Sequence, residues 1–244
     1  MPNMIYGTAW KKEETTRLVE EALLCGFKAI DTACQPRHYR EDLVGLALQN
    51  AIAKGIKRDD IFIQTKFTPI SGQDVNNMPY LSSDDLIIQL EKSFIKSKAN
   101  LQTDFIDSYL IHSPFSPMQE FIKVYRTMEE FVQCGQVGQI GISNCYDLKL
   151  LSYLYDVAIV KPKVVQNRFY ADSNYDKEIR EFCKQKDITY QSFWSLTANP
   201  HILNSTELRD IALKHKRTIA QVFYKFLNQI GITHQKGKAK LNKY

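Results

Sequence analysis

The sequence predicts an α/β protein, a (β/α)8 TIM barrel that is incomplete at its C-terminal helix. Strand-like and helix-like segments alternate along nearly all 244 residues, without a linker or low-complexity block. Such alternation is typical of a parallel sheet built from β-α units, and one barrel of this kind takes ~250 residues. A doubly wound sheet would need a glycine-rich turn after the first strand, and Gly7-Thr8-Ala9-Trp10 supplies a single glycine.

Short apolar runs predict the strands, near residues 3–7, 27–31, 60–66, 105–111, 137–142, 163–167 and 187–193, with an eighth beginning at 230–233. Helical periodicity predicts helices near 13–25, 41–54, 83–97, 119–133, 146–156, 175–186 and 205–229. Ser82 and Ser83 before an acidic pair favour a helix start there, and the last helical region is expected to break near Lys216. The sequence thus predicts eight strands but only seven helical regions, so the helix that would complete an eightfold barrel is not found. We assign residues 1–233 to the barrel and 234–244 to a basic tail.

Composition excludes several classes of protein. The net charge of +5 is spread among acids except at residues 236–243, which hold four lysines and no acid. We interpret that cluster as a solvated terminus, not a nucleic-acid site. Five widely separated cysteines without a CxxC spacing indicate neither a disulfide framework nor a metal site. No leader or ~18-residue apolar run is found, so we expect a cytoplasmic protein without membrane or nucleic-acid partners.

Polar residues close consecutive predicted strands. Asp31, Lys66 and His112 end the second, third and fourth strands, and Tyr39 follows Asp31. Strand ends converge on the active-site face of such a barrel. Lys66 would make the Tyr39 phenol a better acid, Asp31 would keep Lys66 charged, and His112 would orient a carbonyl. Taken singly, Asp31 also suits a turn cap, Lys66 a solvated lysine and His112 a turn histidine.

Side chains do not deliver hydride, so reduction of that carbonyl would require a nicotinamide cofactor. Six sequence words occur in the order of one family: Gly7-Thr8, residues 26–33, Gln64-Thr65-Lys66, residues 110–114, residues 141–144 and Val165-Gln166-Asn167. On these words, residues 5 to about 233 resemble the aldo-keto reductase family, and especially members with a Gln-Pro-basic-His-Tyr insertion.

The resemblance implies a role for each matching residue. Tyr39 would be the proton donor, tuned by Lys66 and Asp31, with His112 positioning the carbonyl. The implied cofactor-binding residues are Thr8, Ser143, Asn144, Gln166, Phe193 and Leu196. Ser143, Asn144 and Gln166 would hold the nicotinamide carboxamide, and Phe193 would stack on its ring, with Trp194 as the alternative. Trp10 would wall the substrate pocket or merely pack. The family favours NADP(H) over NAD(H) and extends it across the barrel mouth.

Two departures from the family pattern stand out. Tyr39 follows Asp31 by eight residues where the commonest form has five, which leaves His38 as a competing acid. After the eighth strand, the family has a Lys-Ser loop and a helix that grip the adenosine phosphate, and residues 232–244 match neither. A frameshift or alternative splice would give such an ending, and sequencing the transcript would test this.

The leading functional hypothesis is an oxidoreductase that reduces small aldehydes or ketones to alcohols with NAD(P)H. The alternative is a catalytically impaired barrel with a binding or regulatory role, because the adenosine-phosphate clamp is missing. A third, less favoured class is a cofactor-independent hydrolase that uses Asp31 and His112. The sequence leaves the particular carbonyl substrate and the oligomeric state open.

Overall fold

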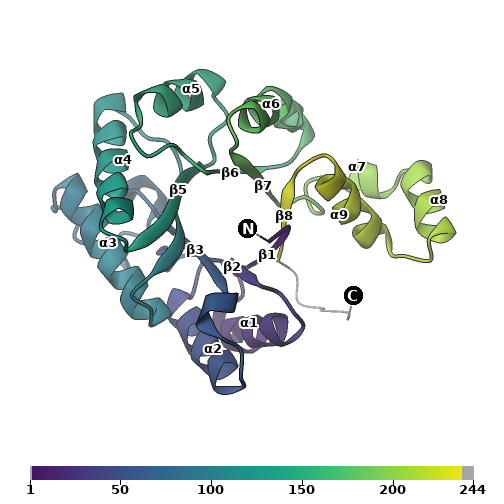
Figure 1. Cartoon of the computed structure of the whole chain (residues 1–244), viewed down its shortest axis with the longest axis horizontal. Helices are drawn as coiled ribbons and strands as arrows, with labels where there is room; N and C mark the ends of the chain where they lie inside the picture. The colour runs from purple at the N-terminus through teal and green to yellow at the C-terminus, as the bar shows by residue number, and fades with distance from the viewer. Residues whose placement is uncertain (1, 238–244) are drawn as a thin grey trace.

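The computed structural model describes residues 2–237, which form a closed barrel of eight parallel strands in sequential order. Figure 1 looks into the barrel, with β1 beside β8. This architecture confirms the (β/α)8 fold class. The strands are β1 (Met4–Gly7), β2 (Ala29–Asp31), β3 (Phe62–Phe67), β4 (Ile106–Ile111), β5 (Val137–Ser143), β6 (Val164–Arg168), β7 (Thr189–Phe193) and β8 (Thr233–Lys236).

Helices lie outside the strands (Figure 1). Those that follow β1 to β6 are α1 (Thr15–Leu24), α2 (Glu41–Ala53), α3 (Leu86–Leu101), α4 (Met118–Gln133), α5 (Leu148–Val157) and α6 (Lys177–Gln185). Between β7 and β8 the chain forms α7 (Pro200–Leu203), α8 (Thr206–Lys214) and α9 (Ile219–Gln229). Short 3₁₀ helices occur at Lys12–Glu14, Arg58–Asp60, Ile70–Gly72 and Ala171–Asp176. Within residues 2–237, none of the helices is both long and apolar enough to cross a bilayer.

The strands have two different faces. In β3, Ile63 and Phe67 join the apolar clusters beneath the helices, whereas Gln64 and Lys66 bond to the buried Asp31. Because successive side chains alternate in a strand, Gln64 and Lys66 share the face toward the barrel axis. The helices therefore bury the apolar face of the sheet, and the barrel interior keeps a polar layer.

Two predicted helix boundaries had different outcomes. The break near Lys216 is confirmed, because α8 ends at Lys214, Lys216 has a φ of 50°, and Thr218 begins α9 with a capping box. The helix expected from residue 83 begins instead at Leu86. Asp85, and neither serine, caps it, since its carboxylate accepts a 3.0 Å hydrogen bond from the Ile87 backbone N–H.

The eighth strand lies later than the sequence predicted. A turn at Gly231, where φ is 81°, ends α9, and the strand runs from Thr233 to Lys236. His234, Gln235 and Lys236 thus pair in the sheet, although the sequence placed them in the tail. The rest of the predicted tail, residues 238–244, lies outside the described residues.

A glycine lies at the seam where the barrel closes. β8 pairs with β1, and a Cβ atom on Gly7 would lie 2.6 Å from Cδ of the Gln235 side chain. A side chain at position 7 would therefore displace the end of Gln235, which donates a hydrogen bond to Asp31. At the seam between β1 and β8, the small Gly7 therefore leaves space for the polar side chain of Gln235.

Candidate active site

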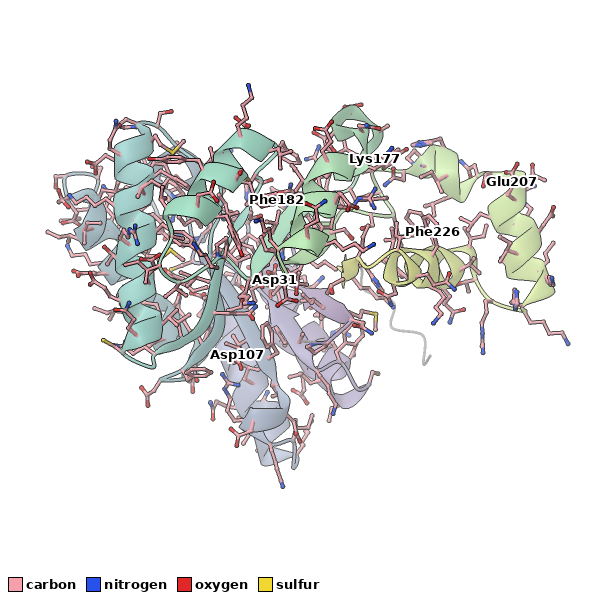
Figure 2. All side chains as sticks on the ribbon, turned by 45° about the horizontal axis from the view of Figure 1, so that its top comes forward. Asp31, Asp107, Lys177, Phe182, Glu207 and Phe226 are labelled. Atoms are coloured by element: carbon pink, nitrogen blue, oxygen red, sulfur yellow. The ribbon has the colours of Figure 1, made fainter. Side chains whose placement is uncertain are left out.

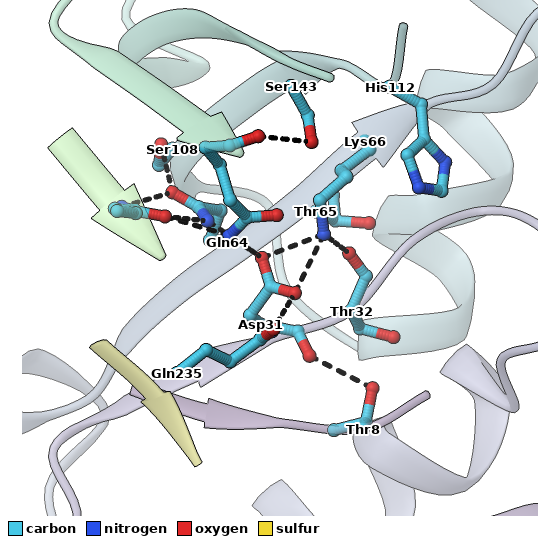
Figure 3. A network of polar contacts seen from close by, with 12 residues as sticks. Thr8, Asp31, Thr32, Gln64, Thr65, Lys66, Ser108, His112, Ser143 and Gln235 are labelled. Atoms are coloured by element: carbon cyan, nitrogen blue, oxygen red, sulfur yellow. Dashed lines mark hydrogen bonds and ion pairs between the residues drawn. The ribbon is translucent and has the colours of Figure 1, made fainter. Parts of the chain in front are cut away.

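An ion pair lies at the centre of the barrel, between the ends of β2 and β3. The Lys66 Nζ is 2.8 and 2.7 Å from the two carboxylate oxygens of Asp31, and both side chains are 1% exposed (Figure 3). Lys66 also donates to the Thr32 carbonyl at 2.8 Å. Figure 2 places Asp31 where the strands converge. All three ammonium hydrogens thus have acceptors, as a buried lysine requires.

A layer of glutamines surrounds this carboxylate. Gln64 and Gln166 donate to Asp31 Oδ1 at 2.7 and 3.0 Å, and Gln235 donates to Oδ2. Gln191 accepts from both Gln64 and Gln166 at 2.8 Å. Donors from β3, β6 and β8 therefore converge on one carboxylate, which suits a buried negative charge.

The sequence reasoning missed most of this layer. Gln64, Gln191 and Gln235 were not recognised as site residues. Gln64 could have been found from the sequence. It precedes Lys66 by two positions, and residues two apart in a strand share a face. Gln235 had no such signal, because it was assigned to the tail.

Tyr39 and His112 complete the set that the sequence predicted. The Lys66 Nζ lies 5.5 Å from the centre of the Tyr39 ring, and the Tyr39 and His112 ring centres are 5.9 Å apart at an interplanar angle of 66°. The Tyr39 hydroxyl makes no hydrogen bond to another residue in the range 2–237. The structure thus brings the four residues together and leaves the phenol oxygen for a ligand.

The acidity of Tyr39 differs from the sequence-based expectation. Burial raises the pKa of the phenol, and the negative charge of Asp31 raises it further. The positive charge of Lys66, whose ammonium is hydrogen-bonded to Asp31 and Thr32, does not outweigh these two effects. Burial also lowers the pKa of Lys66, against the opposing effect of Asp31. At neutral pH the phenol is protonated, which is the state that a proton donor needs.

His112 is held by Thr68. Its Nδ1 lies 2.6 Å from the Thr68 Oγ1, and its backbone carbonyl accepts from the Asn144 side chain at 2.9 Å. Burial lowers the pKa of His112 well below its usual value, and the charge of Lys66 adds to this. The ring is therefore neutral at pH 7. If Nδ1 accepts from Thr68, the proton is on Nε2, where it can be donated to a carbonyl oxygen.

The inserted segment before Tyr39 packs against the first loop. The His38 and Trp10 ring centres are 4.0 Å apart, and the His38 Nδ1 lies 2.9 Å from the Gln35 Oε1. The Trp10 backbone N–H donates to the His38 carbonyl at 2.8 Å. Trp10 is 58% exposed. The insertion thus supports Trp10 at the rim of the barrel, and its contact with a substrate stays a prediction.

The predicted carboxamide-binding residues lie on the neighbouring strands β5 and β6. Gln166 accepts through its backbone carbonyl from the Ser143 hydroxyl at 2.8 Å and from the Asn144 backbone N–H at 3.0 Å. One hydroxyl and two amide side chains supply both donors and acceptors, as a primary carboxamide requires. The Gln166 Oε1 accepts no hydrogen bond from the described residues, so this side of the site fits a nicotinamide.

The remaining cofactor candidates lie at the ends of β1 and β7. Thr8 is buried and its hydroxyl donates to the Asp31 carbonyl at 2.9 Å. Phe193 is half-buried and lies on the same face of β7 as the inward Gln191, two residues before it. Leu196 is half-buried in the loop after β7. Trp194 instead lies against Arg168, with 4.3 Å between its ring centre and the guanidinium carbon.

A cavity of about 380 Å³ lies beside Tyr39, on the helix side of the loop between β2 and α2. Its lining includes Cys34, Glu41 and Asn100 but none of Asp31, Lys66, His112, Gln166 or Phe193. The barrel mouth, where those residues converge, is therefore the better candidate for the reaction site.

The fold and the site together define a (β/α)8 barrel with acid–base groups at its mouth. A profile of the aldo/keto reductase family matches residues 3–234. The chain is 30% identical to glyoxal reductase of Bacillus subtilis over 219 residues, 90% of this chain and 71% of that protein. It is also 30% identical to NAD(P)H-dependent 6'-deoxychalcone synthase of Glycine max over 246 residues, 91% of this chain and 72% of that protein.

Solved structures agree with the sequence matches. An aldo/keto reductase from Brucella melitensis superposes with a TM-score of 0.80 at 28% identity, covering 98% of this chain and 84% of the other. The chain belongs to the aldo-keto reductase family. Its class of chemistry is accordingly carbonyl reduction with a nicotinamide cofactor.

Proposed function

We propose that this protein reduces a small aldehyde or ketone to an alcohol with NAD(P)H, and that Tyr39 donates the proton. One observation carries the proposal. The Tyr39 ring lies 5.5 Å from the Lys66 Nζ and 5.9 Å from the His112 ring, around the buried Asp31. A protonated phenol and a neutral imidazole beside an ion pair form a general-acid site for a carbonyl oxygen.

Each residue has a separate task in this proposal. His112 donates a hydrogen bond to the carbonyl oxygen and orients it toward Tyr39. Tyr39 then releases its proton to that oxygen as the alkoxide forms, because an alkoxide is a stronger base than a phenolate. Lys66, fixed by Asp31, stabilises the negative charge that develops on the phenol oxygen. The set works in the protonation states that burial and the neighbouring charges favour.

The cofactor residues follow the same placement. The bound nicotinamide supplies the hydride that side chains cannot. Ser143, Asn144 and Gln166 would hold its carboxamide, Phe193 would lie against its ring, and Thr8 and Leu196 would complete the walls. We favour NADP(H) over NAD(H), as the family more often uses it. The name of the Bacillus subtilis relative denotes a small dicarbonyl, which supports a substrate of that size. The five cysteines are free, which suits a cytoplasmic location.

Replacing the phenol tests the proposal. Tyr39→Phe should lower kcat for a small aldehyde by about 10²- to 10⁴-fold, the usual contribution of a general acid. The Kd for NADPH should change less than about twofold, because the ring is retained. Tyr153→Phe is the matched control, since Tyr153 is 49% exposed on α5 and far from the barrel axis. Equal turnover of Tyr39→Phe and the wild type would contradict the proton-donor role.

The second candidate is a barrel that no longer binds the cofactor. The observation that favours it is that the Asn144 Nδ2 already donates to His112, while the Gln166 Nε2 donates to Asp31 and Gln191. A bound carboxamide would have to use their oxygens or displace these contacts. Titration of the purified chain with NADPH and NADH separates the candidates, because the enzyme should bind one of them and the impaired barrel neither.

A further inference from the structure

The cavity of about 380 Å³ beside Tyr39 has no role in the reaction proposed above. Its wall is formed by the loop between β2 and α2, the first turn of α2, residues 77–79 and the last two turns of α3. The first residue of α2, Glu41, lines this cavity and is 3% exposed. Its carboxylate accepts hydrogen bonds from the Cys34 thiol and the Asn100 side chain, and both of these residues also line the cavity. The Glu41 carboxylate therefore lies at the cavity wall.

The hydrogen-bond donors to this carboxylate are neutral groups. The Glu41 Oε1 accepts from the hydroxyl groups of Thr65 and Ser97. The Oε2 accepts from the Asn100 Nδ2 at 3.1 Å, and a carboxylate oxygen has room for a second hydrogen bond. Glu41 forms no ion pair with any residue in the range 2–237. Its negative charge is thus held by hydrogen bonds and not by a directly bonded cation.

Lys66 is the buried cation within electrostatic range of Glu41, but it is already bonded to another acid. The charge of Glu41 raises the pKa of Lys66, against the larger effect of burial. The Lys66 ammonium gives its hydrogen bonds to Asp31 and Thr32. Two buried carboxylates therefore share one buried ammonium. Burial raises the pKa of Glu41, so a further positive charge in the cavity would stabilise its ionised form.

The rest of the wall favours an organic cation over a metal ion. In the described part of the chain, no group of three or more His, Cys, Asp or Glu side chains is placed to hold a metal. The Asn100 Oδ1 accepts no hydrogen bond from the described residues, so it can take a second hydrogen of an ammonium group. The apolar part of the lining comes from four side chains, Pro36, Tyr39, Met78 and Pro79. Such a lining suits a ligand with one charged end and an apolar body.

We propose that this cavity binds a small organic ammonium ion, which donates to Glu41 and places its apolar body against Met78 and the Tyr39 ring. Arg40 and Asp42 also line the cavity, but they form an ion pair with each other at 2.7 Å. The buried Glu41 is therefore the carboxylate in the wall that an added cation would neutralise. The cavity lies outside the barrel mouth, so binding requires neither a cofactor nor carbonyl reduction.

Calorimetric titration of the purified protein at pH 7 tests this binding. Benzylamine is an ammonium ion at that pH, whereas benzyl alcohol has nearly the same shape without a charge and benzoate carries the opposite charge. Benzylamine should bind to a single site, at least about 10-fold more tightly than either analogue. Glu41→Gln should weaken benzylamine binding by about 10- to 100-fold, the range expected for a hydrogen bond between charged groups, and change that of benzyl alcohol by less than about twofold.

A surface variant keeps the test valid if Glu41→Gln does not fold. Lys96 is exposed on α3 and lines the cavity, so its charge repels an ammonium ion that enters. Lys96→Gln should therefore strengthen benzylamine binding by about two- to fivefold, the range for charges near the surface, and leave benzyl alcohol unaffected. Lys149→Gln removes an exposed lysine on α5 that does not line the cavity, and it should bind benzylamine as the wild type does.

Three results would overturn the inference. The first is that benzylamine binds no more tightly than benzyl alcohol, and the second is that benzoate binds more tightly than both. The third is that Lys96→Gln and a folded Glu41→Gln both leave the benzylamine affinity unchanged, since the amine would then bind elsewhere, such as beside Asp31 at the barrel mouth. These titrations contain no NADPH, so full turnover of Tyr39→Phe would contradict the proposed function and leave this site intact.

Discussion

At the scale of single residues, Asp31 holds the site together. Its carboxylate accepts from the Lys66 ammonium and from the side-chain amides of Gln64, Gln166 and Gln235. Lys66 and Gln64 lie on β3, Gln166 on β6 and Gln235 on β8. The carboxylate therefore links the position of Lys66 to the packing of the whole interior layer.

Asp31→Asn should be strongly destabilising. The substitution leaves the Lys66 ammonium buried without a counter-charge and turns one acceptor into a donor that faces other donors. Loss of one partner of a buried ion pair costs about 3–5 kcal/mol in the free energy of unfolding. Urea unfolding followed by circular dichroism at pH 7 measures this loss.

The control is an ion pair of similar geometry on the surface. Lys163 and Asp187 are 3.0 Å apart, with the Asp187 side chain 95% exposed, so Asp187→Asn should change stability by less than about 1 kcal/mol. If Asp31→Asn were as mild as this control, Lys66 would be able to lose its proton in the folded barrel at little cost.

At the scale of elements, the sequence predicted order and type better than ends. Strand alternation and helical periodicity located the β-α units. Each element buries one face, so apolar residues recur along it with the period of a strand or a helix. The fold class, the helix break near Lys216 and the gathering of Asp31, Tyr39, Lys66 and His112 followed from that. The position of β8 did not, because Gly231 and its neighbours form a turn whose conformation depends on contacts with α9.

The polar interior was equally hard to predict. Gln191 and Gln235 contact Gln64 and Asp31 across the barrel, at sequence separations of 127 and 204 residues. No local pattern records such pairs, and a glutamine in a strand is as easily placed in solvent. The upward shift of the Tyr39 pKa was also not predicted, because it depends on burial and on the hydrogen bonds that hold the Lys66 ammonium against Asp31.

The contact between α2 and α3 depends on Gly45. A Cβ atom at this position would lie 1.9 Å from the Asn100 backbone oxygen, and Asn100 also donates to the buried Glu41 at 3.1 Å. Helix propensity alone favours alanine over glycine by ~1 kcal/mol. Overpacking against backbone outweighs this, so Gly45→Ala should lower the free energy of unfolding by about 1–3 kcal/mol.

Thermal and urea unfolding of Gly45→Ala measure the sign. Leu46→Ala is the neighbouring control, because Leu46 is 45% exposed and should change stability only slightly. A Gly45→Ala protein more stable than the wild type would show that α3 can move away without loss, and that the close approach of the two helices is not required.

At the scale of the whole molecule, closure of the barrel depends on the pairing of β8 with β1 and β7. His234 lies in this last strand, opposite Met4, and stacks on the Tyr224 ring of α9 with 4.1 Å between ring centres. Its Nδ1 is 3.1 Å from the Asn228 side chain, whose amide satisfies more partners when its nitrogen donates to His234. The buried Nε2 then carries a proton but finds no acceptor within residues 2–237.

Protonation of His234 should therefore destabilise the folded barrel at low pH. Burial lowers the pKa of His234 to about 4, with a smaller effect from Lys236, whereas an unfolded histidine has an ordinary value of 6.5. Between these values the unfolded chain binds more protons, so the free energy of unfolding falls as pH drops from 6.5 to 4. The full loss amounts to about 3 kcal/mol.

Urea midpoints at pH 7, 5.5 and 4.5 should fall more steeply for the wild type than for His234→Phe, which keeps a ring on Tyr224 but cannot titrate. His215→Gln, at an exposed position, should retain the wild-type slope. Parallel pH profiles for His234→Phe and the wild type would assign the acid sensitivity to other groups and remove His234 from the account of barrel closure.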